Sequence, residues 1–228
     1  MLCDNILSFF EHVRFEGTLP EGIVMMNPYA ESAEVRALCQ LFYSKFYNDN
    51  APRHLILGIN PGRLGAGATG IPFTDTKRLQ TECGIVVPGQ VTHEPSSVFM
   101  YEMIRSFGGP EVFYKSFYIS SICPLGFIRQ KGRSVVNYNY YDDPALESCV
   151  REFILENIRT QIQLSGRADV CFCLGTGKNY KYLLKINEKH QFFSSVIPLE
   201  HPRYIMQYKL KAKEQYLRDY VSKLSSVL

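Results

Sequence analysis

The chain has 228 residues, and 25 Lys and Arg against 22 Asp and Glu give a formal net charge of +3 with neutral histidines. Contents of 46% hydrophobic and 21% charged residues exclude disordered and fibrous architectures and fit one globular domain over residues 1–228. No apolar run approaches the ~20 residues of a membrane helix, and so small a net charge does not by itself indicate a nucleic-acid-binding protein.

Helical and strand patterns alternate along the chain. In chain order, the sequence predicts a helix over 32–47, a strand over 54–60, a helix over 97–107, a strand over 116–122, a helix over 144–165, a strand over 168–174, a helix over 178–188, a strand over 194–199 and a helix over 207–225. The strands are short, nearly continuous in apolar character and bounded by Gly, Pro or polar residues, as strands buried on both faces are. The alternation predicts a parallel sheet flanked by helices.

Two irregular segments interrupt these elements. A Gly- and Ala-rich stretch, Gly62–Gly70, directly follows the first strand, and a long loop with basic residues and tyrosines covers Pro124–Asp143. Loops of that length in a compact domain are usually functional. Arg129, Lys131 and Arg133 lie in the second segment, and the sequence leaves their role open.

Polar residues follow the carboxyl ends of all four predicted strands. They lie in the segments Asn60–Gly62, Ser121–Pro124, Gly175–Lys178 and His201–Arg203. In an open parallel sheet, ligands bind in the crevice beyond these strand ends. We therefore expect the four segments to meet at one rim and to form a binding site.

The cysteines and the N-terminus bear on the cellular compartment. Seven scattered cysteines with no CxxC spacing are typical of reduced, buried thiols, and we expect no disulfide framework and no metal site. Asp4 stands where a signal peptide would carry Lys or Arg, and no small-residue cleavage site follows. These features predict a cytoplasmic protein.

Two glycine-containing turns invite a functional interpretation. In Gly58–Gly62, Pro61 excludes helical backbone angles at Asn60 and holds this amide at a strand tip, where it could orient a water or a sugar hydroxyl; an ordinary Asn-Pro-Gly turn is an equal alternative. Gly175–Asn179 resembles a phosphate loop but has Phe172 and Asn179 where that pattern requires Gly and Ser or Thr. For this second segment we favour a strand-to-helix turn.

His201 lies at the end of the fourth predicted strand and is followed by a mixture of cations and aromatic rings. Arg203, Tyr204 and Lys209 suit a segment that contacts phosphates and wedges into a base stack. Lys211 and Lys213 fit the solvated face of the last helix instead. A histidine at a strand end, rather than on an apolar face, is a candidate catalytic residue.

Residues Gly58–Phe73 resemble the first motif of the uracil-DNA glycosylase superfamily. The most similar branch is that of the single-strand-selective monofunctional uracil-DNA glycosylases (SMUG), with the pattern GMNPGxxGxxxTGxPF, and the chain resembles a divergent, bacterial-type member. Three further segments agree in order: Met26–Ala30 with an NP-containing segment, Ser121–Leu125 with NLCPL, and His201-Pro202 with the start of HPSPRNP. The resemblance extends over about residues 24–203 and implies a three-layer α/β/α sandwich with a central four-stranded parallel sheet.

The resemblance implies roles for the residues of the rim. Asn60 matches the Asn that positions the attacking water, and His201 matches the His that hydrogen-bonds uracil O2 as negative charge develops there. Phe73 matches the aromatic ring that stacks on the flipped base, and Ile59 and Gly62 contribute backbone around that base.

The chain departs from the family pattern at two places. Ser121, whose short hydroxyl both donates and accepts, stands where the family has its base-reading Asn. This departure predicts either looser discrimination between uracil and other deaminated bases or discrimination by another group. The SPRNP wedge is absent, and Arg203, Tyr204 and Ile205 are the candidate substitutes for it. The candidate DNA-binding residues are Arg203, Tyr204 and Lys209. No lysine at the matching loops is positioned to form a Schiff base, which predicts a monofunctional enzyme.

The function implied by the resemblance is base-excision repair: hydrolytic removal of uracil, with other deaminated bases as an extension, from single- or double-stranded DNA. The resemblance also implies a monomer that needs neither a metal nor another cofactor. One alternative is a catalytically weak, lesion-binding module on the same fold. The other is a small-nucleotide-binding α/β protein, which rests only on the glycine turns.

Overall fold

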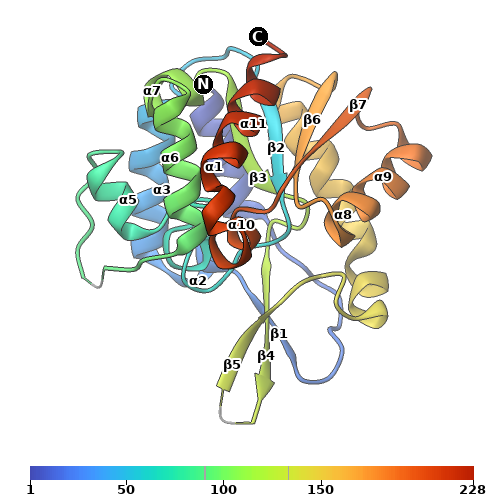
Figure 1. Ribbon diagram of the computed structural model, residues 1–228. Helices are drawn as coiled ribbons and strands as arrows, with labels where there is room; N and C mark the ends of the chain where they lie inside the picture. Colours follow the sequence, from blue (N-terminus) through green and yellow to red (C-terminus); the bar gives the residue numbers. More distant parts are fainter. Residues whose placement is uncertain (90, 133) are drawn as a thin grey trace.

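The computed structural model describes residues 1–89, 91–132 and 134–228. Its main sheet contains β2 (His54–Gly58), β3 (Phe117–Ser121), β6 (Val170–Leu174) and β7 (Ser195–Leu199). All neighbouring pairs are parallel, in the order β3-β2-β6-β7 (Figure 1). Nearly every side chain of these strands is buried or half-buried, in agreement with their continuous apolar pattern. The predicted four-stranded parallel sheet is confirmed.

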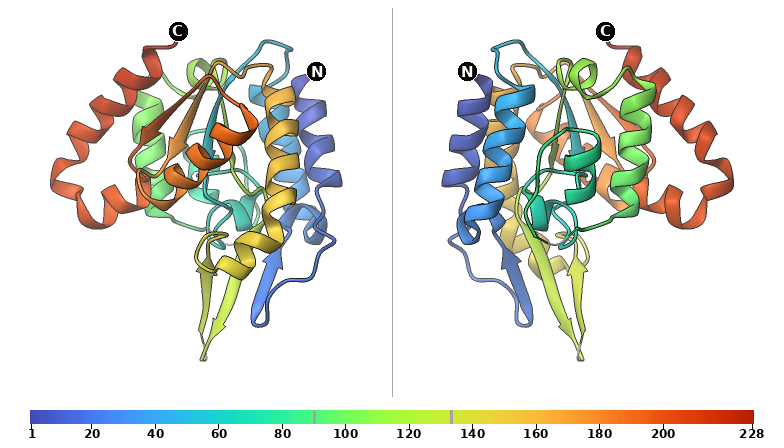
Figure 2. Two further views of the ribbon diagram at one scale, coloured as in Figure 1. Left: turned by 90° about the vertical axis from the view of Figure 1, so that its right-hand side faces the viewer. Right: turned by 90° about the vertical axis from the view of Figure 1, so that its left-hand side faces the viewer.

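Helices cover both faces of this sheet. The long ones are α1 (Leu2–His12), α3 (Ala33–Phe46), α6 (Pro95–Ser106), α8 (Pro144–Ser165), α9 (Lys178–His190) and α11 (Lys213–Ser225). The short ones are α2 (Pro28–Glu31), α4 (Ala66–Thr69), α5 (Thr76–Thr81), α7 (Pro110–Tyr114) and α10 (Pro202–Tyr208). Figure 2 shows α6 and α11 on one side of the sheet and α8 on the other, which gives the expected three layers. No helix in the described part of the chain is long and apolar enough to cross a membrane.

The expectation of an irregular loop over Pro124–Asp143 is wrong. This segment contains a hairpin of β4 (Gly126–Lys131) and β5 (Ser134–Tyr138), and β4 also pairs antiparallel with β1 (Ile23–Met26). The resulting three-stranded sheet projects from the body of the molecule (Figures 1 and 2). The short strands were hard to predict because the partner that stabilises β4 lies about a hundred residues earlier in the chain. Arg133 lies outside the described residues.

The single helix expected over 207–225 is also wrong. The chain instead forms α10, a 3-10 turn over Leu210–Ala212, and then α11. The break falls at Lys209, whose backbone angles (φ −126°, ψ 24°) leave the helical path. The start of α10 is fixed by Pro202 in its first turn and by the His201 side chain, which accepts the N–H of Arg203. His201 is therefore a helix cap as well as a strand-end residue.

Arg53 anchors the start of β2 in the interior. Its side chain is fully buried, and its Nε donates to the carbonyl of Tyr114 at 2.8 Å and its Nη1 to the carbonyl of Ala51 at 2.6 Å. Its Nη2 makes an ion pair with Asp49 at 2.8 Å. All three guanidinium nitrogens are thus used: one joins the start of β2 to the end of α7, and two hold the segment that precedes the strand.

We expect Arg53→Met to lower the free energy of unfolding by about 2 kcal/mol, because the buried carbonyl of Tyr114 loses its donor, and Ala51 and Asp49 lose theirs as well. Urea denaturation followed by circular dichroism measures the change. Arg105→Met is the matched control, since its ion pair with Glu82 is half exposed and is worth at most ~1 kcal/mol. Equal losses in the two variants would contradict the role given to Arg53.

Candidate functional site

A pocket of about 290 Å³ opens beyond the carboxyl ends of β2, β3 and β7. Eight of the nine residues predicted for the site line it: Ile59, Asn60, Gly62, Phe73, Ser121, His201, Arg203 and Tyr204. The ninth, Lys209, is outside the lining, with its Nζ 6.0 Å from the centre of the Tyr204 ring. Three of the four segments expected to meet at this rim line the pocket, and the fourth, Gly175–Lys178, lines a neighbouring hollow instead.

Asn60 is held by two hydrogen bonds from the segment that follows the hairpin. Its Nδ2 donates to the carbonyl of Tyr138 at 3.1 Å, and its Oδ1 accepts the N–H of Tyr140 at 3.2 Å. The two bonds distinguish the two ends of the amide, so its orientation is fixed. Nδ2 also makes a longer contact, at 3.5 Å, with the carbonyl of Pro61. One lone pair of Oδ1 remains available for a water or a substrate.

Tyr140 connects this segment to the turn after β6. Its buried hydroxyl donates to Oδ1 of Asn179 at 2.8 Å, and Nδ2 of Asn179 donates to the carbonyl of Leu174 at 3.0 Å. Asn179 is therefore a structural residue in the first turn of α9, and the strand-to-helix interpretation of Gly175–Asn179 is confirmed. The loop beside it opens into a neighbouring hollow that also contacts His201 and Ile59.

Phe73 has a left-handed backbone conformation, with φ at +54°, which is unusual for a bulky residue. Its ring lies 5.8 Å from the His201 ring, centre to centre, and packs against the backbone of Gly58. A Cβ on Gly58 would stand only 2.8 Å from Cε2 of that ring, so glycine is required there. The strained backbone and the close approach together place an aromatic face at the pocket wall.

Ser121 lies beside the end of β2. It pairs with Gly58 in the parallel register, and the chain continues with a hydrogen bond from the N–H of Cys123 to the carbonyl of Ile59 at 3.1 Å. Below it, Nε2 of Gln161 on α8 donates to the Ser121 carbonyl at 3.2 Å. The side chain of Ser121 is buried at the base of the pocket.

His201 is neutral at physiological pH. Burial, together with the nearby positive charge of Arg203, lowers the pKa of His201 to about 4. Its Nδ1 accepts the N–H of Arg203 at 3.2 Å, which places the single proton of the neutral ring on Nε2. The site therefore contains an uncharged N–H donor whose orientation is set by the start of α10.

Several lining residues were missed by sequence reasoning. They are Asn137, Asn139, Glu94, Ser96, Gln207 and Tyr208. Asn137 and Asn139 are two residues apart, the spacing that puts side chains on one face of a strand, and Tyr208 follows Tyr204 by one helical turn. These spacings indicate a shared face only when it is known that the hairpin is a strand pair and that α10 is a helix.

Asn137 lies over the loop that follows Asn60. Its Oδ1 accepts the N–H of Arg63 at 3.1 Å, and its Nδ2 is 3.3 Å from the place that a Cβ on Gly62 would take. The hairpin thus covers the glycine at which a larger residue would narrow the pocket.

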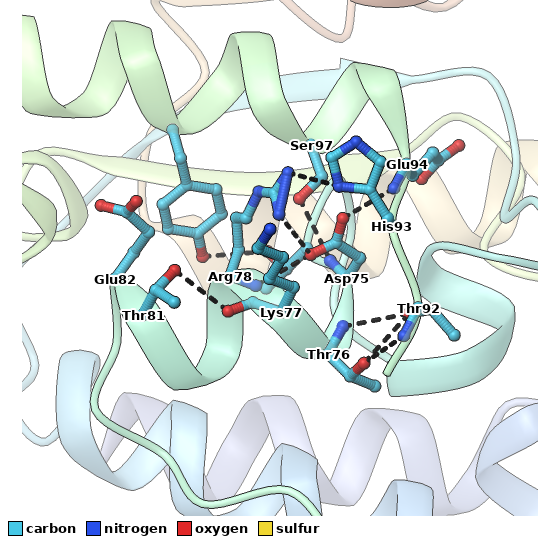
Figure 3. A network of polar contacts seen from close by, with 12 residues as sticks. Asp75, Thr76, Lys77, Arg78, Thr81, Glu82, Thr92, His93, Glu94 and Ser97 are labelled. Atoms are coloured by element: carbon cyan, nitrogen blue, oxygen red, sulfur yellow. Dashed lines mark hydrogen bonds and ion pairs between the residues drawn. The ribbon is translucent and has the colours of Figure 1, made fainter. Parts of the chain in front are cut away.

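Buried Asp75 joins the segment after Phe73 to the segment before α6 (Figure 3). Its Oδ1 accepts the N–H of Arg78 at 2.8 Å, and its Oδ2 accepts the N–H of Glu94 at 2.7 Å. Its own N–H donates to Oγ of Ser97 at 3.1 Å. This network fixes two walls of the pocket relative to each other.

No three or more His, Cys, Asp or Glu side chains among the described residues are grouped as a metal site. Six of the seven cysteines are buried.

Comparisons with known proteins agree with this geometry. The sequence model of the Uracil DNA glycosylase superfamily matches residues 44–225. The chain belongs to this superfamily. The crystal structure of wild-type Pedobacter heparinus SMUG2 superimposes with a TM-score of 0.97 and 54% sequence identity, covering 99% of this chain and 97% of that chain.

Two curated mammalian relatives are more distant. The single-strand selective monofunctional uracil-DNA glycosylase of Rattus norvegicus is 29% identical over 98 residues, which are 36% of this chain and 35% of that protein. Its counterpart in Bos taurus is 26% identical over 110 residues, 41% of this chain and 40% of that protein. The chain thus spans less than half the length of the curated relatives that it matches.

We expect His201 to remain neutral until the pH falls to about 4, and NMR titration of its imidazole Cε1 proton, assigned with His201→Asn, measures the midpoint. Because this folded pKa lies below the ordinary 6.5, stability is fully present above pH 6.5 and is lost as the pH falls towards 4. A midpoint near 6.5 would contradict the burial that lowers the pKa of His201.

Proposed function

We propose that this protein is a monofunctional DNA glycosylase that flips uracil out of DNA and hydrolyses its N-glycosidic bond. The observation that carries the proposal is the pairing of two oriented, uncharged groups in one pocket, the Asn60 amide and the His201 Nε2–H, beside the ring of Phe73. Membership of the superfamily supports the same reaction.

The chemistry needs stabilisation of a departing anion. The bond between C1′ of the sugar and N1 of the base breaks, the electron pair leaves with the base, and positive charge develops on the sugar. His201 donates from Nε2 to the base oxygen that becomes negative, a contribution comparable to the ~10²–10³ in rate of an oxyanion-hole donor. Asn60 orients the water whose oxygen then bonds to C1′.

Extrusion of the base must be compensated by new contacts. Stacking on Phe73 recovers about 1–3 kcal/mol of the cost of unstacking. Around the pocket mouth, α10 presents Arg203, Tyr204 and Tyr208, and Lys209 lies beyond Tyr204. Two exposed rings flanked by two cations suit a DNA backbone and its unstacked bases.

Which nucleobases the enzyme removes depends on Ser121, at the floor of the pocket. The hydroxyl of Ser121 both donates and accepts, so it accommodates more than one arrangement of base oxygen and N–H. This property supports uracil as the main substrate and other deaminated bases as further substrates. No lysine is among the described residues that line the pocket, which supports hydrolysis without strand cleavage. We propose that the enzyme acts as a monomer, without a cofactor.

We expect the wild-type chain to convert a single-stranded oligonucleotide with one uracil into an alkali-labile product, seen on a denaturing gel. Asn60→Ala and His201→Ala should each lower the single-turnover rate by at least ~10², because each removes a group that acts in the transition state. His12→Ala, an exposed histidine on α1, is the control and should keep the wild-type rate.

The same assay tests the alternative of a lesion-binding module. Turnover with substrate in excess is expected for an enzyme. Absence of any product from the folded wild-type chain, on single-stranded and duplex uracil DNA alike, would contradict the proposed function, and tight salt-sensitive binding would then favour the module.

We expect Tyr208→Ala to weaken binding of a single-stranded oligonucleotide by about tenfold, the loss of one base–aromatic stack. Fluorescence anisotropy at constant salt measures it. Tyr216→Phe on α11 is the control. Unchanged affinity of Tyr208→Ala would remove α10 from the DNA interface.

A further inference from the structure

Glu94 is the one acidic side chain among the described residues that line the pocket. It lies on the wall formed by the segment before α6, and its backbone N–H is held by the buried Asp75 at 2.7 Å. Its Oε2 lies so close to Gly65 that a Cβ there would overlap it. The network in Figure 3 therefore holds the backbone of Glu94, and the carboxylate occupies the space left by the absence of a side chain at residue 65.

The carboxylate of Glu94 has no structural partner among the described residues. No hydrogen bond or ion pair to its oxygens occurs in the part of the chain that the structure describes, although Arg203 from α10 is close enough to act on it electrostatically. Native structures rarely leave a partly buried carboxylate without a donor unless it has another role. We therefore expect this carboxylate to contact the substrate or the attacking water in the pocket.

Neither of the two residues assigned so far can accept the proton that the attacking water loses. Asn60 is uncharged and cannot take a proton from the attacking water. His201 is neutral, but its Nδ1 is occupied by the N–H of Arg203 and its Nε2 already carries the proton. Of the lining groups, the Glu94 carboxylate is left to accept it.

Resting on the proposed function, we propose that Glu94 is a catalytic residue: its carboxylate stabilises the positive charge developing on the deoxyribose and accepts the proton of the attacking water. The bond from C1′ to N1 breaks and its electron pair goes to the base. The water oxygen bonds to C1′, one water proton goes to Glu94, and Glu94 then returns it to solvent or to the departing base anion. The products are an abasic site and the free base.

The environment supports this role. Burial raises the pKa of Glu94 above its ordinary 4.5, the charge of Arg203 opposes this shift, and that of Asp75 adds to it. A carboxylate with a raised pKa is a better base. The other charged or titratable groups nearby are His201, across the same pocket, and His93, whose Nδ1 lies 2.9 Å from Nη2 of Arg78.

Single-turnover excision from an oligonucleotide with one uracil tests the proposal, measured between pH 4.5 and 8. Glu94→Gln keeps the shape and loses the base, and we expect its rate to fall by about 10² or more at neutral pH. The wild-type excision rate should decline as the pH falls and Glu94 is protonated, which forms the acid limb of the pH–rate profile. Glu94→Gln should lack this acid limb. Glu94→Asp should be slowed but should keep the limb. Glu111→Gln, exposed on α7, should match the wild type.

Oligonucleotide affinity and thermal unfolding are measured alongside. We expect Glu94→Gln to unfold within a few degrees of the wild type and to bind DNA as tightly or more tightly, because a negative charge facing the phosphates is removed.

Three results would overturn the proposal. A wild-type rate and pH profile in Glu94→Gln would exclude Glu94 from the chemistry while the glycosylase function stands. Weaker DNA binding with an unchanged acid limb would show that Glu94 only positions Arg203. No excision by the wild-type chain would remove the proposed function, and this inference with it.

Discussion

The site depends on one pair of hydrogen bonds, those that fix the Asn60 amide between the carbonyl of Tyr138 and the N–H of Tyr140. Asn60 follows β2, an inner strand of the parallel sheet, whereas Tyr138 ends the hairpin of the second sheet and Tyr140 lies two residues after it. The bonds therefore join the two sheets and orient the amide at the same time. The hydroxyl of Tyr140 also holds this segment, because it donates to Asn179 in the first turn of α9, the helix that follows β6.

The opposite wall is organised by backbone geometry at α10. A helix that starts at Pro202 presents its first N–H groups to His201, and this bond sets the tautomer of the ring. Burial keeps the imidazole neutral, so the pocket offers a donor without the cost of a buried charge. The buried Asp75 network holds a third wall, which carries Phe73 on one side and Glu94 on the other. In the proposed reaction, the leaving anion and the developing cation would therefore meet different groups.

Much of this arrangement could be predicted from the sequence. The four apolar runs gave the parallel sheet, and the positions after them gave Asn60, Ser121 and His201, because strand ends of a parallel sheet converge. The hairpin could not be predicted, since its strands are stabilised by β1 and by the Asn60 amide, both remote in sequence. For the same reason Asn137 and Glu94 were missed: their place in the pocket follows from tertiary contacts, not from a local pattern. The break at Lys209 was hidden by continuous amphipathic character on both sides of it.

Mass spectrometry of a single-stranded oligonucleotide with one uracil, after incubation with the wild-type chain, tests the central claim most directly. The proposed function predicts free uracil and an unbroken strand that carries one abasic site, because it assigns hydrolysis of the glycosidic bond to this pocket, whose described lining residues include no lysine amine to cut the strand. An unaltered oligonucleotide, recovered from a solution in which binding is saturated, would contradict it.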